Sequence, residues 1–174
     1  MSGKLLATFL VLAALVAGGA MFYLQVYGYY DRLSVTGPED VVLTRLDGTT
    51  EPVSHVDFQA IDSESSPIRY RACFKTNVPI TELAAHYQAA EEAVPLHAPF
   101  WFDCFDAEKI GEALEQGQAQ AFMSIAHVTY GIDRIAAVFP NGQGVVWQQI
   151  NRCGEKAFDG DPVPDGCPPP PETF

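Results

Sequence analysis

Basic residues are scarce in this chain. Its 174 residues include ten lysines and arginines against 22 aspartates and glutamates, which gives a formal net charge of −12. All 22 acidic residues and nine of the basic ones lie after position 30, so residues 31–174 carry nine minus 22, or −13. Such a surface repels the phosphates of nucleic acids and the headgroups of anionic lipids. Nucleic acid is therefore not expected as a partner, whereas a cationic partner or simple solubility fits the charge.

Motifs for catalysis and cofactor binding are also missing. The sequence contains no G-x-S-x-G elbow, no H-E-x-x-H pair and no nucleotide-binding motif. Glu82 and His86 are spaced to share one face of a helix, but a catalytic zinc site needs three protein ligands, so an ordinary surface pair is the better interpretation. The aspartates at 159, 161 and 165 lack the later ligands of a calcium loop. No metal site and no cofactor are predicted.

Residues 5–24 form a run without charge (LLATFLVLAALVAGGAMFYL). Twenty apolar residues in a helix rise about 30 Å, which matches the hydrocarbon thickness of a bilayer. A cleaved signal peptide is the alternative, because Gly18 and Ala20 imitate a cleavage site, but its apolar region has only about 7–15 residues. Four tyrosines then follow at positions typical of an interfacial aromatic belt, namely 23, 27, 29 and 30. We predict an uncleaved anchor over residues 1–30 that contacts membrane lipid through residues 5–24.

The chain has four cysteines, all after the anchor: Cys73, Cys104, Cys153 and Cys167. None forms a C-x-x-C pair, and an even number in an exported domain favours disulfides over free thiols in a cytosolic domain. Three connectivities are open. We favour Cys73–Cys104 and Cys153–Cys167, because the second pair would order a short loop rich in glycine, aspartate and proline. Charges flanking the anchor give only a slight bias, so the cysteines decide the orientation of this single-pass chain. They place the domain in an oxidising compartment, which in a bacterium is the periplasm.

Alternation of apolar and polar residues, turn residues and helix caps predict the elements of the domain. Asn141-Gly142 is the strongest hairpin signal, Asp106 is a candidate N-cap, and Gly117 a candidate helix end. Strands are predicted at 40–46, 52–61, 68–75, 119–129, 132–139 and 145–150, and helices at 80–90 and 106–116.

These elements predict an α+β protein in which a transmembrane helix precedes one mainly antiparallel sheet domain with two helices and disulfide staples. The domain is expected over residues 31–158. Residues 159–174 are rich in proline and are expected to form a loop stapled to the domain, ending in an extended polyproline tail. The order of the strands does not follow from the sequence.

Two surfaces are candidates for binding. Arg69, Arg71 and Lys75 would share one side of the strand 68–75 and could bind a small anion, although pairing with acidic residues on neighbouring strands is the alternative. An aromatic run beside Cys104 could form an exposed patch that docks on a membrane protein, and packing in the core is its alternative. The residues proposed for this patch are Phe100, Trp101 and Phe102.

Long stretches of the chain resemble a family of small uncharacterised membrane-anchored proteins of alphaproteobacteria. They are FQAIDSESSPIRYRACF (58–74), YGIDRIAAVFPNGQGVVWQQINRCGEKAFDGDPVPDGCPPPP (130–171) and the N-terminal segment MSGKLLATFLVLAALVAGGAMFYLQVYGYY. Some proteins of this kind carry a histidine kinase label, which a single domain without a nucleotide-binding motif does not support. The resemblance implies a bacterial inner-membrane setting and supplies no activity and no site residues.

We therefore expect a non-enzymatic, membrane-anchored periplasmic accessory or interaction protein that supports a membrane protein complex. One alternative is a periplasmic domain that binds a small anion through Arg69 and Arg71. A second alternative is a metal-dependent hydrolase that uses His86 and Glu82.

Overall fold

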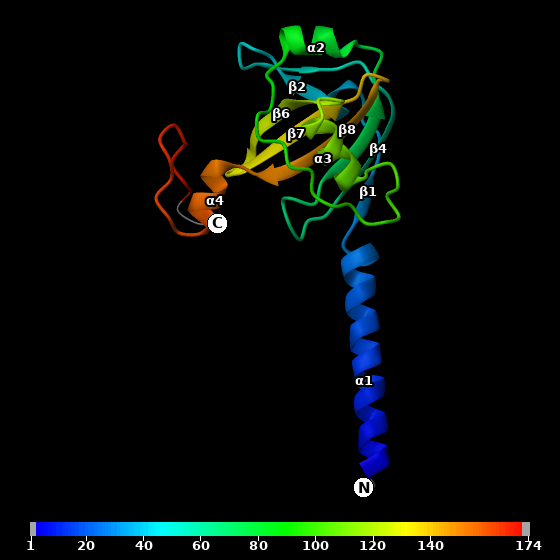
Figure 1. Ribbon diagram of the computed structural model, residues 1–174. Helices are drawn as coiled ribbons and strands as arrows, with labels where there is room; N and C mark the ends of the chain where they lie inside the picture. Colours follow the sequence, from blue (N-terminus) through cyan, green and yellow to red (C-terminus); the bar gives the residue numbers. More distant parts are fainter. Residues whose placement is uncertain (1–2, 172–174) are drawn as a thin grey trace.

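The computed structural model of the protein describes residues 3–171 (Figure 1). Helix α1 spans Gly3–Tyr23 and continues through one π-helical turn, Leu24–Gly28. Its alanine- and leucine-rich sequence favours a helix, and none of its residues is buried by the rest of the protein. Gly3–Gly28 is long and apolar enough to cross a membrane, and it is the single such helix within residues 3–171. This finding is consistent with a single-pass anchor.

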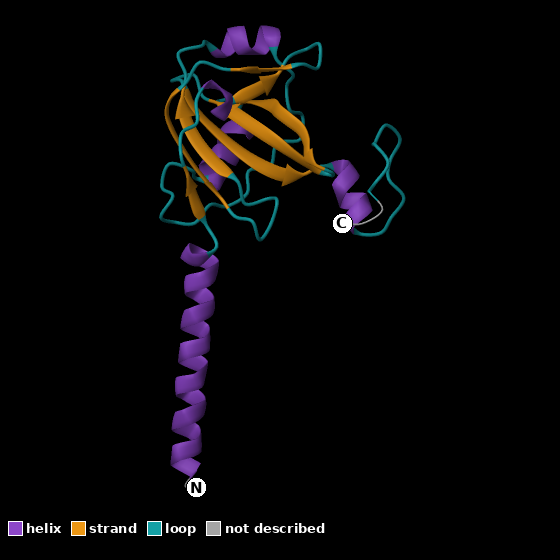
Figure 2. Cartoon of the chain, turned by 180° about the vertical axis from the view of Figure 1, so that it is seen from behind, coloured by secondary structure: helices purple, strands orange, loops and turns teal. Residues whose placement is uncertain are grey.

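The domain is built on a six-stranded antiparallel sheet with the strand order β1-β4-β5-β8-β7-β6 (Figure 2). In that order the strands are Asp31–Leu33, Val56–Asp62, Arg71–Lys75, Gln143–Ile150, Ile132–Val138 and Gln120–Thr129. A small second sheet pairs β2 (Val42–Thr44) with β3 (Thr50–Pro52). The helices are α2 (Ile80–His86), α3 (Ala107–Glu115) and α4 (Arg152–Phe158), with a 3-10 turn at Pro38–Asp40.

Both faces of the sheet are covered, so the central strands are buried on both sides. One core cluster joins Ala72 and Phe74 of β5 to Leu43 of β2 and Leu83 of α2. The other joins Cys73 and the fully buried Trp147 to side chains of α3 and of the loop before it. Strand β8 lies between β5 and β7, and six consecutive residues of this strand, 144–149, are therefore buried.

The predicted fold class is confirmed, with an apolar N-terminal helix, a mainly antiparallel sheet and two disulfides. The hairpin at Asn141-Gly142 joins β7 to β8 as predicted. Asp106 caps α3 by accepting the backbone N–H of Lys109, and Gly117 ends that helix with a φ of +67°. The helix predicted at 80–90 is shorter than expected, because the chain turns to an extended backbone at Tyr87.

Several boundaries differ from the prediction, and two elements were missed. The predicted strand 52–61 is divided between β3 and β4, and the predicted strand 68–75 begins only at Arg71. The edge strand β1 pairs with β4 through Arg32 and Ile61, and it was not predicted. No element was predicted at residues 152–158, which form helix α4. The predicted polyproline tail at 168–174 has no regular structure at 168–171, and its last three residues lie outside the described residues.

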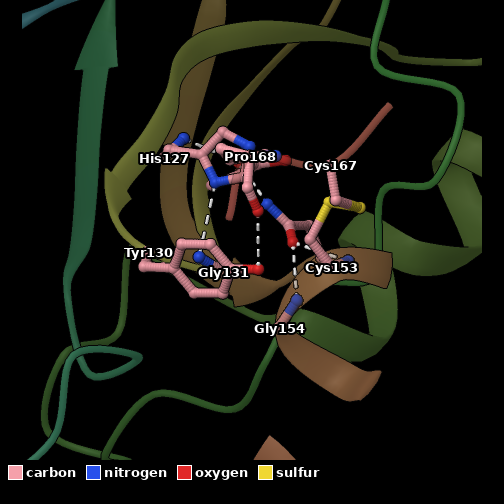
Figure 3. The surroundings of a disulfide bond; sticks show 9 residues. His127, Tyr130, Gly131, Cys153, Gly154, Cys167 and Pro168 are labelled. Atoms are coloured by element: carbon pink, nitrogen blue, oxygen red, sulfur yellow. Dashed lines mark hydrogen bonds between the residues drawn. A yellow bond between two sulfur atoms is a disulfide. The ribbon is translucent and has the colours of Figure 1, made fainter. Parts of the chain in front are cut away.

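Asn151 caps helix α4, because its side-chain oxygen accepts the backbone N–H groups of Cys153 and Gly154. Figure 3 shows how the disulfide Cys153–Cys167 then ties the C-terminal loop to this helix. Gly154 packs so closely on Gly131 that a Cβ atom on either residue would overlap the other backbone. The C-terminal segment therefore stands on the β6–β7 turn, away from the sheet core (Figure 1).

Candidate functional site

The disulfide Cys73–Cys104 fixes the loop that precedes α3 onto strand β5. Its Cα atoms are 6.3 Å apart, and it closes a separation of 31 residues. Cys73 is buried in the sheet and Cys104 is exposed in the loop. Together with Cys153–Cys167 it confirms the predicted pairing, and no free cysteine is present among the described residues. The aromatic run is therefore held on a pinned loop.

Arg71 holds the same loop from inside the domain. Only 3% of this residue is exposed, and its guanidinium donates hydrogen bonds to backbone carbonyls. The Nε atom donates to Leu96 at 2.8 Å and Nη2 donates to His97 at 3.1 Å, while Nη1 donates to Ile68 and Tyr70. Burial of the guanidinium lowers the pKa of Arg71 to about 10. Arg71 thus joins the start of β5 to the loop that carries the aromatic run.

The aromatic run contacts the end of the apolar N-terminal helix. The indole Nε1–H of Trp101 donates a 2.7 Å hydrogen bond to the carbonyl of Val26, within the last turn of the anchor helix. The Trp101 ring stacks on Tyr27, with 6.2 Å between ring centroids, and meets Tyr30 edge-on. Phe102 is buried in the domain core, whereas Phe100 is 70% exposed and lies edge-on to Tyr27. The three residues of the run therefore occupy three different environments.

Two arginines complete this region, which we call the membrane junction and define by Tyr27, Tyr29, Tyr30, Arg32, Arg69, Phe100 and Trp101. The Arg32 guanidinium lies 5.1 Å from the centroid of the Trp101 ring. The Arg69 guanidinium lies 5.4 Å from the Tyr30 ring and 6.0 Å from Tyr29. These distances are those of cation–π contacts. Aromatic and cationic side chains thus gather where the anchor enters the domain.

The structure separates the three basic residues predicted to bind an anion. Arg71 donates its hydrogen bonds to backbone carbonyl oxygens in the core. The alternative expected from the sequence was pairing with acidic side chains on neighbouring strands. Lys75 lies at the other end of β5 and forms a 2.9 Å ion pair with Asp57. Arg69 precedes the strand, so the alternation of side chains along β5 does not apply to it, and it faces the tyrosines of the anchor. The contacts of Arg69 with Tyr29 and Tyr30 could not be found from the sequence, because these tyrosines lie 40 and 39 positions earlier in the chain.

A sequence comparison assigns the domain to a known family. Residues 41–168, which are 128 of the 174 residues, match a protein family of unknown function (DUF6446). The chain belongs to this family. No curated protein and no solved structure matches it. The DUF6446 region contains both disulfides and the aromatic run, whereas the anchor and strand β1 precede it.

The DUF6446 region also carries a cleft of about 510 Å³ beside the disulfide Cys73–Cys104. Its walls come from β4, β5, β8 and the start of α3, and Phe58, Val145 and Ile110 are among its apolar lining residues. Lys75 and Lys109 lie at the cleft, and each is paired with an aspartate, Asp57 and Asp106 respectively. These exposed ion pairs leave the cleft without an unpaired lysine among its lining residues.

Within residues 3–171, no group of three or more histidine, cysteine, aspartate or glutamate side chains is arranged to hold a metal ion. The Nδ1 atom of His86 lies 2.8 Å from the backbone carbonyl of Glu82 and so forms a local helix contact. In the C-terminal loop, Asp161 forms a 3.1 Å ion pair with Lys156. His86 and Asp161, two of the residues considered for metal binding, are therefore engaged in ordinary local contacts.

Proposed function

We propose that this DUF6446 protein is a non-enzymatic accessory protein of the bacterial inner membrane. Helix α1 anchors it by a single pass, the domain lies in the periplasm, and the protein binds an integral membrane protein in a larger complex. The two disulfides support a periplasmic location of the domain, because such bonds persist in an oxidising compartment and are rare in the cytosol.

The exposure of Phe100 is the observation that carries the proposal. This side chain is 70% exposed although its neighbour Phe102 is only 3% exposed, and it lies edge-on to Tyr27 with 5.9 Å between the ring centroids. Phe100 therefore extends the apolar surface of the anchor onto the domain. A partner helix that packs along α1 would reach it, and burying a phenylalanine of this kind contributes about 1.5–3 kcal/mol.

Rigid placement of the domain supports a role in docking. Trp101 bonds to the anchor through its indole N–H, while Arg71 and the disulfide Cys73–Cys104 hold its loop to the sheet. The exposed ring of Phe100 is thus presented at a fixed position relative to α1. A pre-organised apolar anchor of this type loses little conformational entropy when it binds.

The proposal is tested by purifying the tagged full-length protein in a mild detergent, with a photo-crosslinking amino acid at position 100. We expect a stoichiometric integral membrane protein to co-purify and to crosslink, and Phe100→Ala to reduce its recovery about ten-fold or more, since about 1.5 kcal/mol or more is lost. Solitary protein under each detergent, or a partner recovered equally by Phe100→Ala, would contradict the proposal.

Leu46→Ala is the matched control. Leu46 is 65% exposed, and its backbone N–H bonds to the carbonyl of His86 at the end of α2. Figure 1 shows α2 at the end of the domain opposite to α1. Loss of an exposed apolar side chain there is expected to leave the recovery of the partner unchanged, which separates a local effect at Phe100 from a general loss of surface hydrophobicity.

A further inference from the structure

We propose that Arg32 and Arg69 bind phosphate groups of anionic phospholipids in the membrane leaflet on the side of the domain. The ligand is thus a lipid phosphate, and the site belongs to the membrane junction. This inference does not depend on a protein partner, because it uses two side chains that the docking of a partner on Phe100 does not require.

The length of the anchor places both arginines at the level of the headgroups. The helix Gly3–Gly28 has 26 residues, which rise about 39 Å. The hydrocarbon core is about 30 Å thick, so the last turns of the helix extend into the headgroup layer. Arg32 follows the helix by four residues, and Arg69 contacts Tyr29 and Tyr30 beside it. Figure 1 shows the β4–β5 loop, which carries Arg69, at the end of the domain nearest to α1.

Among the described residues, neither guanidinium has an acidic partner, although the chain is rich in acidic residues. Four ion pairs join charged side chains among residues 3–171, and neither Arg32 nor Arg69 takes part in them. The Nη1 atom of Arg69 is buried and has no hydrogen-bond partner among the described residues. A guanidinium that lies against aromatic rings keeps its N–H donors, and phosphate is the anion that this planar group binds best together with carboxylate.

Charge complementarity selects an anionic lipid. Residues 31–174 carry a formal charge of −13, which repels an anionic membrane surface as a whole. Two arginines at the point of closest approach give a local attraction that offsets this repulsion. A basic residue near an anionic surface strengthens binding about five-fold. The domain would therefore rest on the bilayer through the membrane junction.

The test uses full-length protein in a mild detergent and native mass spectrometry with added phosphatidylglycerol or phosphatidylcholine of the same chain length. We expect wild-type protein to retain phosphatidylglycerol in preference to phosphatidylcholine. Arg32→Gln and Arg69→Gln should each weaken this retention about five-fold. Arg152→Gln, a change of equal charge on the exposed first residue of α4, should leave it unchanged.

Three results would overturn the proposal. They are equal retention of the two lipids, equal retention by wild type and both arginine variants, and release of the bound lipid by millimolar inorganic phosphate, which would make the site one for free phosphate. Arg32 lies on an exposed edge strand, so its variant decides the question even if Arg69→Gln unfolds. Native mass spectrometry reports lipid bound to the protein by itself, so a failure of this site is distinguished from a failure of partner docking.

Discussion

Arg71 shows how one residue can connect the sheet with the membrane junction. Its guanidinium is buried and spans from the backbone of residues 68 and 70 to that of residues 96 and 97. No acidic side chain is needed, because carbonyl oxygens accept each hydrogen bond. Buried carbonyls that lose such a donor are left unsatisfied, and a hydrogen bond to a charged group contributes about 1.5–3 kcal/mol. This residue is therefore expected to control both stability and the position of the aromatic run.

Replacing Arg71 with methionine is predicted to lower the free energy of unfolding by about 3 kcal/mol, since several buried carbonyls lose their donor at once. Urea denaturation of the full-length protein in detergent measures the change. Arg152→Met on the exposed side of α4 is the control and should stay within about 0.5 kcal/mol of wild type. Equal unfolding midpoints for the two variants would show that Arg71 does not hold the loop.

Asp106 and Arg71 show which roles of single residues can be predicted from a sequence. Asp106 was found as an N-cap because capping depends on a few neighbouring residues. The role of Arg71 was not found, because its acceptors Leu96 and His97 lie 25 and 26 residues further along the chain. The alternation of side chains placed Arg71 and Lys75 on one face of a strand. It did not reveal that the loop before α3 covers Arg71 at one end of that face, while Lys75 is exposed at the other end.

At the scale of elements, a disulfide fixes the loop between α2 and α3 onto the sheet. The loop has little regular structure, and Cys73–Cys104 closes a separation of 31 residues between this loop and β5. Cys153–Cys167 closes a separation of only 14 residues in the C-terminal segment. In the chain-entropy description a longer closed loop contributes more stability. The two staples therefore differ in what they hold: one fixes the membrane junction and the other the C-terminal loop.

Changing both Cys73 and Cys104 to serine is predicted to lower the free energy of unfolding by about 3–4 kcal/mol. The matched variant, with serine at Cys153 and Cys167, should instead free the C-terminal loop while the sheet stays folded. Denaturant unfolding and limited proteolysis measure the two effects, with cleavage of the second variant expected within residues 159–171. Early cleavage at residues 91–106 in the second variant but not in the first would contradict this assignment.

The elements that the sequence missed are those that depend on distant contacts. Helix α4 contains Gly154 and borders a proline-rich segment, so its local preference for a helix is weak. Asn151 was an available N-cap signal, but the helix is stabilised by the close packing of Gly154 on Gly131 and by a disulfide. Strand β1 has three residues and exists through its pairing with β4, which a local pattern does not reveal. The order of the strands in the sheet likewise depends on pairing between strands that are distant in the sequence.

At the scale of the whole molecule, the stability of the domain depends on the redox state of the compartment in which it lies. The two disulfides together contribute about 6–7 kcal/mol in the chain-entropy description. A domain of this size is stable by about 5–15 kcal/mol in total. In a reducing compartment the domain would thus lose a large part of its stability, whereas the charges beside α1 give little preference for either orientation.

We therefore predict that the domain is exported and oxidised in the cell. In spheroplasts that express the full-length protein, protease added outside should remove the domain and leave a protected fragment that contains α1. A thiol-alkylating reagent should label none of the four cysteines before reduction and all four after reduction in denaturant. A cytoplasmic protein in the same cells serves as the control for intact membranes. A domain that resists the protease and is alkylated without reduction would place it in the cytoplasm, and the partner would then have to be sought on that side of the membrane.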